Sequence, residues 1–179
     1  MTNRETAIEG RAKALRQAFD ESFARLPVVQ ERATQAFLAI DLAGDGYALR
    51  LAQVAGLHAD KRVTALPGDV PELLGLANFR GTLIPIYDLR ILLGYPPGPP
   101  PRWMVLVAGQ IPVGLAFDRF EGHLALSDAE VIQEGSAPSH AHVAQAVRVG
   151  DKPRRIIDLD AMVESISQRV QAGNMKKEQ

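Results

Sequence analysis

Residues 75–90 read Gly75-Leu-Ala-Asn-Phe-Arg-Gly-Thr-Leu-Ile-Pro-Ile-Tyr-Asp-Leu-Arg90, and this stretch predicts two strands joined by a tight bend. Gly81 permits the bend, because glycine adopts backbone conformations that other residues avoid. Pro85 interrupts an apolar run and has no amide hydrogen, so its strand should lie at a sheet edge or have a free amide side. Asp88 should then cap a short helix that Gly94 ends.

Short strands with alternating apolar residues dominate the chain outside this stretch. Residues 35–42 and 47–52 should pair as a hairpin across the Gly44-Asp45-Gly46 turn. Further strands are expected at residues 82–87, 103–108, 112–118, 120–126, 146–149 and 154–157. Turn residues separate these strands at short intervals, which favours closed antiparallel barrels over a sheet of alternating strands and helices.

One helix is expected near each end of the chain. In the N-terminal region, apolar residues recur every three or four positions before Pro27, which predicts an amphipathic helix. Its apolar stripe comprises Ile8, Ala12, Leu15, Phe19, Phe23 and Leu26. The stripe fits packing on its own protein or docking to a partner, and we favour the first. The C-terminal helix should begin after Asp158 and end at Gly173.

The composition excludes several classes of protein. With 20 basic and 21 acidic residues the formal net charge is −1, which argues against nucleic-acid and anionic-membrane binding. No apolar run approaches the roughly 20 residues of a membrane span, and residues 1–30 are too charged for a signal peptide. We therefore expect a cytoplasmic protein without direct membrane insertion.

The sequence offers little for catalysis or metal binding. The absence of cysteine excludes disulfides, thiol nucleophiles and cysteine-based zinc sites. His140 and His142 would lie on one side of a strand, yet they are part of a loop-like run and lack a third ligand nearby, so we favour structural or incidental histidines. No phosphate-binding glycine motif or serine-hydrolase motif is present. We expect no catalytic residue, metal or cofactor.

The 75–90 stretch also gives the chain a resemblance to the CheW-like family, the adaptors of bacterial chemosensory arrays. The family pattern N-[LVF]-R-G-x-[LIV]-[LIV]-P-[LIV]-x-D-L is matched by Asn78, Phe79, Arg80, Gly81, Leu83, Ile84, Pro85, Ile86, Asp88 and Leu89. Residues 66–68, 71–75, 112–118 and 155–159 resemble the family as well. We therefore divide the chain into a helical extension and linker (residues 1–34), a CheW-like domain (35–165), and the end of the last helix with a polar tail (166–179).

The resemblance implies a mainly β fold of two small five-stranded SH3-like barrels that share a core. It also implies a non-catalytic scaffold that couples the cytoplasmic tip of a methyl-accepting chemoreceptor to the regulatory domain of a CheA-type histidine kinase. The receptor tip is expected between the barrels, near Val54, Gly75, Asn78 and Arg80. The kinase contact is expected at the end of a barrel, including loops at strand ends.

Some positions depart from what the resemblance implies. Gly56 stands where many members have a glutamate that can pair with the motif arginine. Arg80 could therefore bind a partner or form another internal salt bridge, and the sequence favours neither. Arg102, Trp103 and His123 lie where small aliphatic residues are usual. An exposed Trp103 would be a binding anchor, whereas a buried one would be core, and we count Trp103 and His123 among the candidate partner-binding residues.

Three alternatives stay open. The N-terminal helix is similar to one in CheW-like proteins of pilus-type systems that control twitching, and the sequence does not choose between that output and flagellar chemotaxis. The chain could also be a CheW-like domain of a larger protein, although its capped start and polar end favour a complete small protein. A small-molecule-sensing barrel, a metal-sensing barrel or an enzyme on the same fold would instead show an enclosed pocket with convergent polar groups.

The abrupt change of periodicity between Leu26 and Ala36 predicts that the N-terminal helix is separable from the barrels. Deletion of residues 1–29 should leave a β-type circular dichroism spectrum and a cooperative thermal melt, because the expected core lies further along the chain. An unfolded truncated protein would show that the helix belongs to the core.

Overall fold

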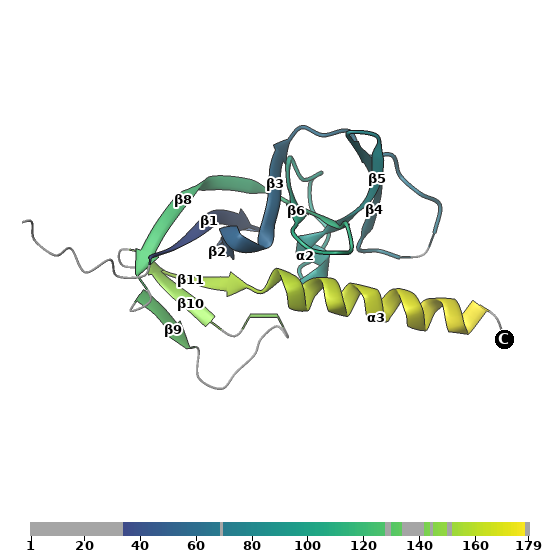
Figure 1. Ribbon diagram of the computed structural model, residues 1–179. Helices are drawn as coiled ribbons and strands as arrows, with labels where there is room; N and C mark the ends of the chain where they lie inside the picture. The colour runs from purple at the N-terminus through teal and green to yellow at the C-terminus, as the bar shows by residue number, and fades with distance from the viewer. Residues whose placement is uncertain are drawn as a thin grey trace, which may run out of the picture. The chain divides into compact units, whose positions relative to one another are not determined.

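A computed structural model describes residues 34–68, 70–127, 130–133, 142–143, 145–149 and 152–177 (Figure 1). The predicted N-terminal helix and His140 lie outside the described residues. Within these ranges, no helix is long and apolar enough to cross a membrane.

The first sheet has six strands in the order β8-β1-β2-β11-β10-β9. They are β1 (Thr34–Leu42), β2 (Asp45–Arg50), β8 (Arg119–Ser127), β9 (Val131–Gln133), β10 (Gln145–Val149) and β11 (Lys152–Ile157). The expected β1–β2 hairpin is present, and β11 adds to β2 in parallel. The sequence did not predict β9, which has three residues and pairs with β10, so this sheet has six strands where five were expected.

The second sheet has five strands in the order β3-β6-β7-β5-β4. They are β3 (Val54–Ala59), β4 (Leu73–Phe79), β5 (Thr82–Asp88), β6 (Trp103–Val107) and β7 (Gly114–Phe117). Backbone hydrogen bonds of 2.8 Å join Thr64 and Leu76 in both directions, N–H to carbonyl oxygen. The chain beyond β3 is thereby bonded to β4 at the opposite end of the strand order. These bonds close the five strands into a barrel.

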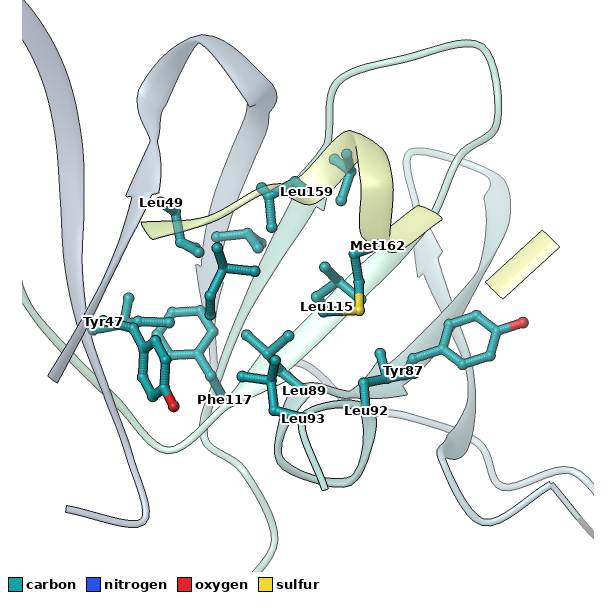
Figure 2. Packing of buried hydrophobic residues seen from close by; sticks show 14 of the residues in the cluster. Tyr47, Leu49, Tyr87, Leu89, Leu92, Leu93, Leu115, Phe117, Leu159 and Met162 are labelled. Carbon is teal, nitrogen blue, oxygen red and sulfur yellow. The ribbon is translucent and has the colours of Figure 1, made fainter. Parts of the chain in front are cut away.

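Most of the buried apolar side chains that the structure describes belong to three clusters. One lies on the inner face of each sheet, around Phe37 and Val147 in the first and around Ile86 and Met104 in the second. The third and largest combines side chains of both sheets with those of two helices (Figure 2). Its labelled members are Tyr47, Leu49, Tyr87, Leu89, Leu92, Leu93, Leu115, Phe117, Leu159 and Met162. This cluster is the shared core that the sequence predicted.

The two described α-helices begin at the expected caps. Asp88 precedes α2 (Leu89–Leu92), and its Oδ1 accepts a 2.9 Å hydrogen bond from the amide of Arg90. Burial raises the pKa of Asp88 above its ordinary value, although the amides of Arg90 and Ile91 oppose this shift. Asp158 caps α3 (Leu159–Lys177) through the amides of Asp160 and Ala161, at 3.1 and 3.3 Å.

The predicted end of the C-terminal helix is wrong, because α3 continues through Gly173 to Lys177. An interior glycine costs a helix only about 1 kcal/mol, and the residues that follow it include good helix formers. A single-turn 3-10 helix, η1 (Leu51–Gln53), links β2 to β3.

Pro85 lies in an interior strand, because β5 has β7 on one side and β4 on the other. The prediction that this strand lies at a sheet edge is therefore wrong. The alternative holds, in which the backbone nitrogen of Pro85 faces a side of the strand where no hydrogen bond is needed. Leu76 faces Pro85 but directs both its backbone groups to Thr64, so Leu76 and Pro85 are not hydrogen-bonded to each other. On the other side the ladder with β7 begins only at Ile86, so the missing N–H of Pro85 leaves no ladder bond unmade.

Gly75 is required where the barrel closes. Its φ is +138°, and a bulge in the β4–β5 register falls between Leu73 and Gly75. A Cβ atom at Gly75 would overlap the carbonyl oxygen of Thr64 and lie 2.9 Å from the Cα atom of Ala65. The neighbours are backbone atoms, which cannot move aside without breaking the closing hydrogen bonds.

Gly75→Ala should lower the free energy of unfolding by about 3 kcal/mol or more, since it combines backbone strain with overpacking against main chain. Gly81→Ala is the matched control, because Gly81 also has a positive φ but nothing lies within 4 Å of its Cβ position. The control should cost only about 1 kcal/mol. Urea denaturation measures the free energy of unfolding of both variants. Equal losses would show that the backbone at Thr64 tolerates a side chain at position 75.

Candidate functional site

The Arg80 bend is a two-residue hairpin turn between the paired residues Phe79 and Thr82. Arg80 and Gly81 have φ values of +52° and +90°, which are typical of a type I′ turn. Asn78 Oδ1 accepts a 2.9 Å hydrogen bond from the amide of Gly81. Asn78, a predicted partner-binding residue, therefore stabilises the turn that presents Arg80.

The Arg80 side chain is exposed, and its guanidinium forms no hydrogen bond or ion pair with another described residue. Gly56 offers it no carboxylate. Instead, His58 Nε2 lies 3.0 Å from the position that a Cβ atom at Gly56 would take. The His58 ring also packs on Phe79, with 4.8 Å between ring centroids. A histidine thus fills the space that a side chain at position 56 would need.

A line of contacts leads from the hairpin tip to the start of β6. Lys61 Nζ lies 4.8 Å from the ring centroid of Phe79, the residue before Arg80. The next step is an exposed ion pair between Asp60 and Arg102, with Nε–Oδ1 and Nη2–Oδ2 distances of 3.0 Å. The amide of Asp60 also donates to the carbonyl of Arg102, at 2.9 Å.

The same line continues through aromatic side chains into the first sheet. Trp103 follows Arg102, and its ring centroid lies 5.4 Å from that of Phe120 in β8. Phe120 in turn contacts His123 edge-on, at 5.3 Å. Trp103 and Phe120 are half-buried against the shared core, whereas His123 is exposed. Trp103 is therefore a core residue with an accessible edge.

We call this continuous set of side chains the rim. It comprises a series of contacting residues and two exposed arginines next to them in the chain, namely Asp60, Lys61, Phe79, Arg102, Trp103, Phe120 and His123 with Arg62 and Arg80. The rim thus contains three of the predicted partner-binding residues, Arg80, Trp103 and His123. Lys61 and Phe120 were missed, because their places depend on barrel closure and on contact between sheets rather than on any local motif.

Two predicted partner-binding residues lie away from the rim. Val54 is the first residue of β3, at the end opposite Ala59, and is half-buried against the shared core. Gly75 is buried beneath Thr64 and is needed for closure. Their contact with a partner stays a prediction.

The described residues line two hollows of note. One of about 380 Å³ is lined by Arg50, Gln53, Gln145, Ile156 and Asp158, and its polar side chains already hydrogen-bond to one another in the pairs Arg50–Gln145 and Gln53–Asp158. A hollow of about 420 Å³ beside Gly98, Pro100 and Pro101 is lined mainly by apolar residues, with Lys61 and the buried Asp88. The carboxylate of Asp88 already caps α2. No three histidine, aspartate or glutamate side chains in the described ranges are grouped so as to hold a metal ion. His142 is half-buried, and desolvation lowers its pKa.

The CheW-like domain model matches residues 36–167, nearly three quarters of the chain. The chain belongs to the CheW-like domain family. Its curated relatives include the chemotaxis protein CheW of Bacillus subtilis, 26% identical over 133 residues that cover 69% of this chain and 83% of the relative. A probable chemotaxis protein CheW of Rhizobium etli is 28% identical over 132 residues, covering 70% and 84%.

A solved structure supports the fold of this CheW-like domain. The scaffolding protein TtCheW from Thermoanaerobacter tengcongensis superposes with a TM-score of 0.64 at 21% identity, over 70% of this chain and 89% of that one. The family match contains every strand from Ala36 onward and the first half of α3, so the rim lies entirely within the CheW-like domain.

The left-handed backbone conformation of Arg80 predicts how substitutions at this position change the free energy of unfolding. Arg80→Gly should leave the free energy of unfolding unchanged or raise it by up to about 1 kcal/mol, because glycine relieves the positive φ but is more flexible when unfolded. Arg80→Val should lower it by about 1 kcal/mol or more, because a β-branched residue fits this conformation poorly. Thermal denaturation of both variants measures the difference, and a large loss in Arg80→Gly would show that the arginine side chain stabilises the fold.

Proposed function

We propose that this CheW-like protein is a non-catalytic adaptor that couples chemoreceptors to a CheA-type histidine kinase in a bacterial chemosensory array. The observation that carries the proposal is Arg80, an exposed cation without a described partner on a rigid hairpin turn within the family domain. The names of the relatives support the chemotaxis setting. The receptor segment would be the cytoplasmic tip, so the adaptor would act in the cytoplasm.

Binding alone would perform this function. The rim crosses from the second sheet to the first through the Trp103–Phe120 contact. A single receptor segment lying along it would touch both sheets, which the shared core holds in one arrangement. A surface that is rigid before binding loses little conformational entropy when the partner docks.

An adaptor also needs a second surface for the kinase. The rim includes Trp103 at the start of β6, whereas the loop that follows Val107 lies at the other end of that strand. The two ends are separated by about 15 Å, given the rise of a strand. In this loop Ile111 is 53% exposed and lines a shallow hollow with Val163 of α3. We assign the kinase contact to this strand-end loop, far enough from the rim for both partners to bind together.

Arg80→Asp should weaken docking of the receptor tip by roughly thirtyfold or more, because replacement of a central interface arginine often costs about 2 kcal/mol. The melting temperature should change little, since surface charge changes typically shift stability by about 0.5 kcal/mol. Titration calorimetry with receptor-tip and kinase regulatory-domain fragments from the same genome, beside a thermal melt, tests both expectations.

Arg148→Asp provides the matched control, because Arg148 is an exposed arginine on β10, outside the rim. Receptor binding should survive this change. Normal binding of Arg80→Asp to both fragments would remove Arg80 from the interface. Lost binding together with a strongly lowered melting temperature would make Arg80 a structural residue instead.

A further inference from the structure

The part of the rim around the hairpin tip carries a marked local excess of positive charge. Lys61, Arg62, Arg80 and Arg102 are all exposed, and Asp60 is the acidic residue among them. Asp60 is fully engaged by Arg102, since both its oxygens lie 3.0 Å from guanidinium nitrogens. Both side chains remain about two-thirds exposed, at 65% for Arg102 and 64% for Asp60.

The other three cations lack carboxylate partners among the described residues. Lys61 packs on the Phe79 ring, while Arg62 and Arg80 form no ion pair within the described parts of the chain. His58 occupies the space beside Gly56. Position 56 therefore has an imidazole next to it and supplies no carboxylate to the cations. An anionic group from outside the chain would therefore meet cations that no described carboxylate already engages.

Apolar surface adjoins these cations directly. Arg102 is followed by Trp103, which lies half-buried beside Phe120, while His123 is exposed at the far end. We propose that the rim recognises an acidic protein segment. Carboxylates of the segment bind Lys61, Arg62 and Arg80, and an apolar side chain next to them packs on Trp103 and Phe120. The inference deepens the proposed function and rests on it for the use of the rim as a docking surface.

Charge and backbone geometry favour a protein partner over a nucleic acid. The whole chain has a formal net charge of −1, so the cations form a local patch rather than the broad basic face that a phosphate backbone needs. Among the described non-glycine residues only Ala43, Asp60 and Arg80 have a positive φ, and two of these three lie at this patch. Tight turns thus define the backbone from which these cations project, which lowers the entropy lost when specific contacts to a few carboxylates form.

The test uses two synthetic amphipathic helices with the same leucine stripe, one flanked by glutamates and one by lysines. The full chain, labelled with ¹⁵N, is titrated with each. The glutamate helix should shift the amide signals of residues 58–62, 79–81 and 102–103, and the lysine helix should not. Raising the salt from about 0.05 to about 0.3 M should weaken binding of the glutamate helix at least several-fold, because exposed charges are screened.

Two substitutions should change the affinity in opposite directions. Lys61→Gln removes a cation and should weaken binding of the glutamate helix by about twofold to fivefold. Asp60→Asn removes the acid, releases Arg102 and should strengthen binding by a similar factor. Asparagine tolerates the positive φ of Asp60, so the fold should persist. Arg148→Gln, on β10, is the control and should change nothing.

The outcomes separate this inference from the proposed function. Binding of the glutamate helix at the rim, strengthened by Asp60→Asn, supports the acidic partner even if the receptor-tip fragment fails to bind. Receptor-tip binding that is insensitive to salt and to both substitutions overturns the acidic partner and leaves the adaptor function standing. The acidic partner is also overturned if both helices bind equally, if neither binds, or if the signal shifts lie elsewhere on the chain. A greater affinity for a nucleic-acid probe than for the glutamate helix would overturn it as well.

Discussion

The shared apolar cluster is the interaction on which the rest of the structure depends. Each small sheet has one cluster on its own inner face, and its other face is covered by the other sheet and by α3. A unit of about 60 residues is only marginally stable by itself, because it buries a smaller fraction of its apolar surface than a larger domain does. Phe117 from the second sheet and Leu38 from the first belong to the same buried cluster, so the two sheets stabilise each other. The rim crosses from one sheet to the other, and its geometry therefore depends on this cluster.

Closure of the second sheet adds a constraint on the backbone. The hydrogen bonds between Thr64 and Leu76 bring the chain after β3 alongside β4, which places Lys61 against Phe79. Gly75 permits this approach because it has no side chain to meet Thr64. Gly75, which is buried and has no side chain, thus helps to position the surface cation Lys61. The close approach of Thr64 accounts for a glycine at this position of the 75–90 motif, and contact of Gly75 with a partner stays a prediction.

Features that depend on residues close in sequence could be predicted, and those that depend on distant pairing could not. The turn at Gly81 and the caps at Asp88 and Asp158 involve partners within three residues, so the local pattern contains the information. The family resemblance added the two-barrel fold and the prediction that Arg80 binds a partner. The rim could not be predicted from the sequence. It joins positions 61, 79, 102 and 120 through the closure of the second sheet and through a contact between the two sheets. The strands β3 and β9 were missed for similar reasons, since small residues and short length leave them dependent on their neighbours.

The free-energy cost of the positive φ at Arg80 bears on its proposed docking role. A non-glycine residue with a positive φ costs about 1 kcal/mol, so a partner or a structural contact should offset it. Ala43 has such a contact, because its amide donates a 2.8 Å hydrogen bond to Asp118, and Asp60 gains the Arg102 ion pair. Arg80 gains neither from the described chain, although glycine or asparagine would fit its turn better. An exposed arginine with a positive φ and no described partner is what the proposed docking role of Arg80 requires.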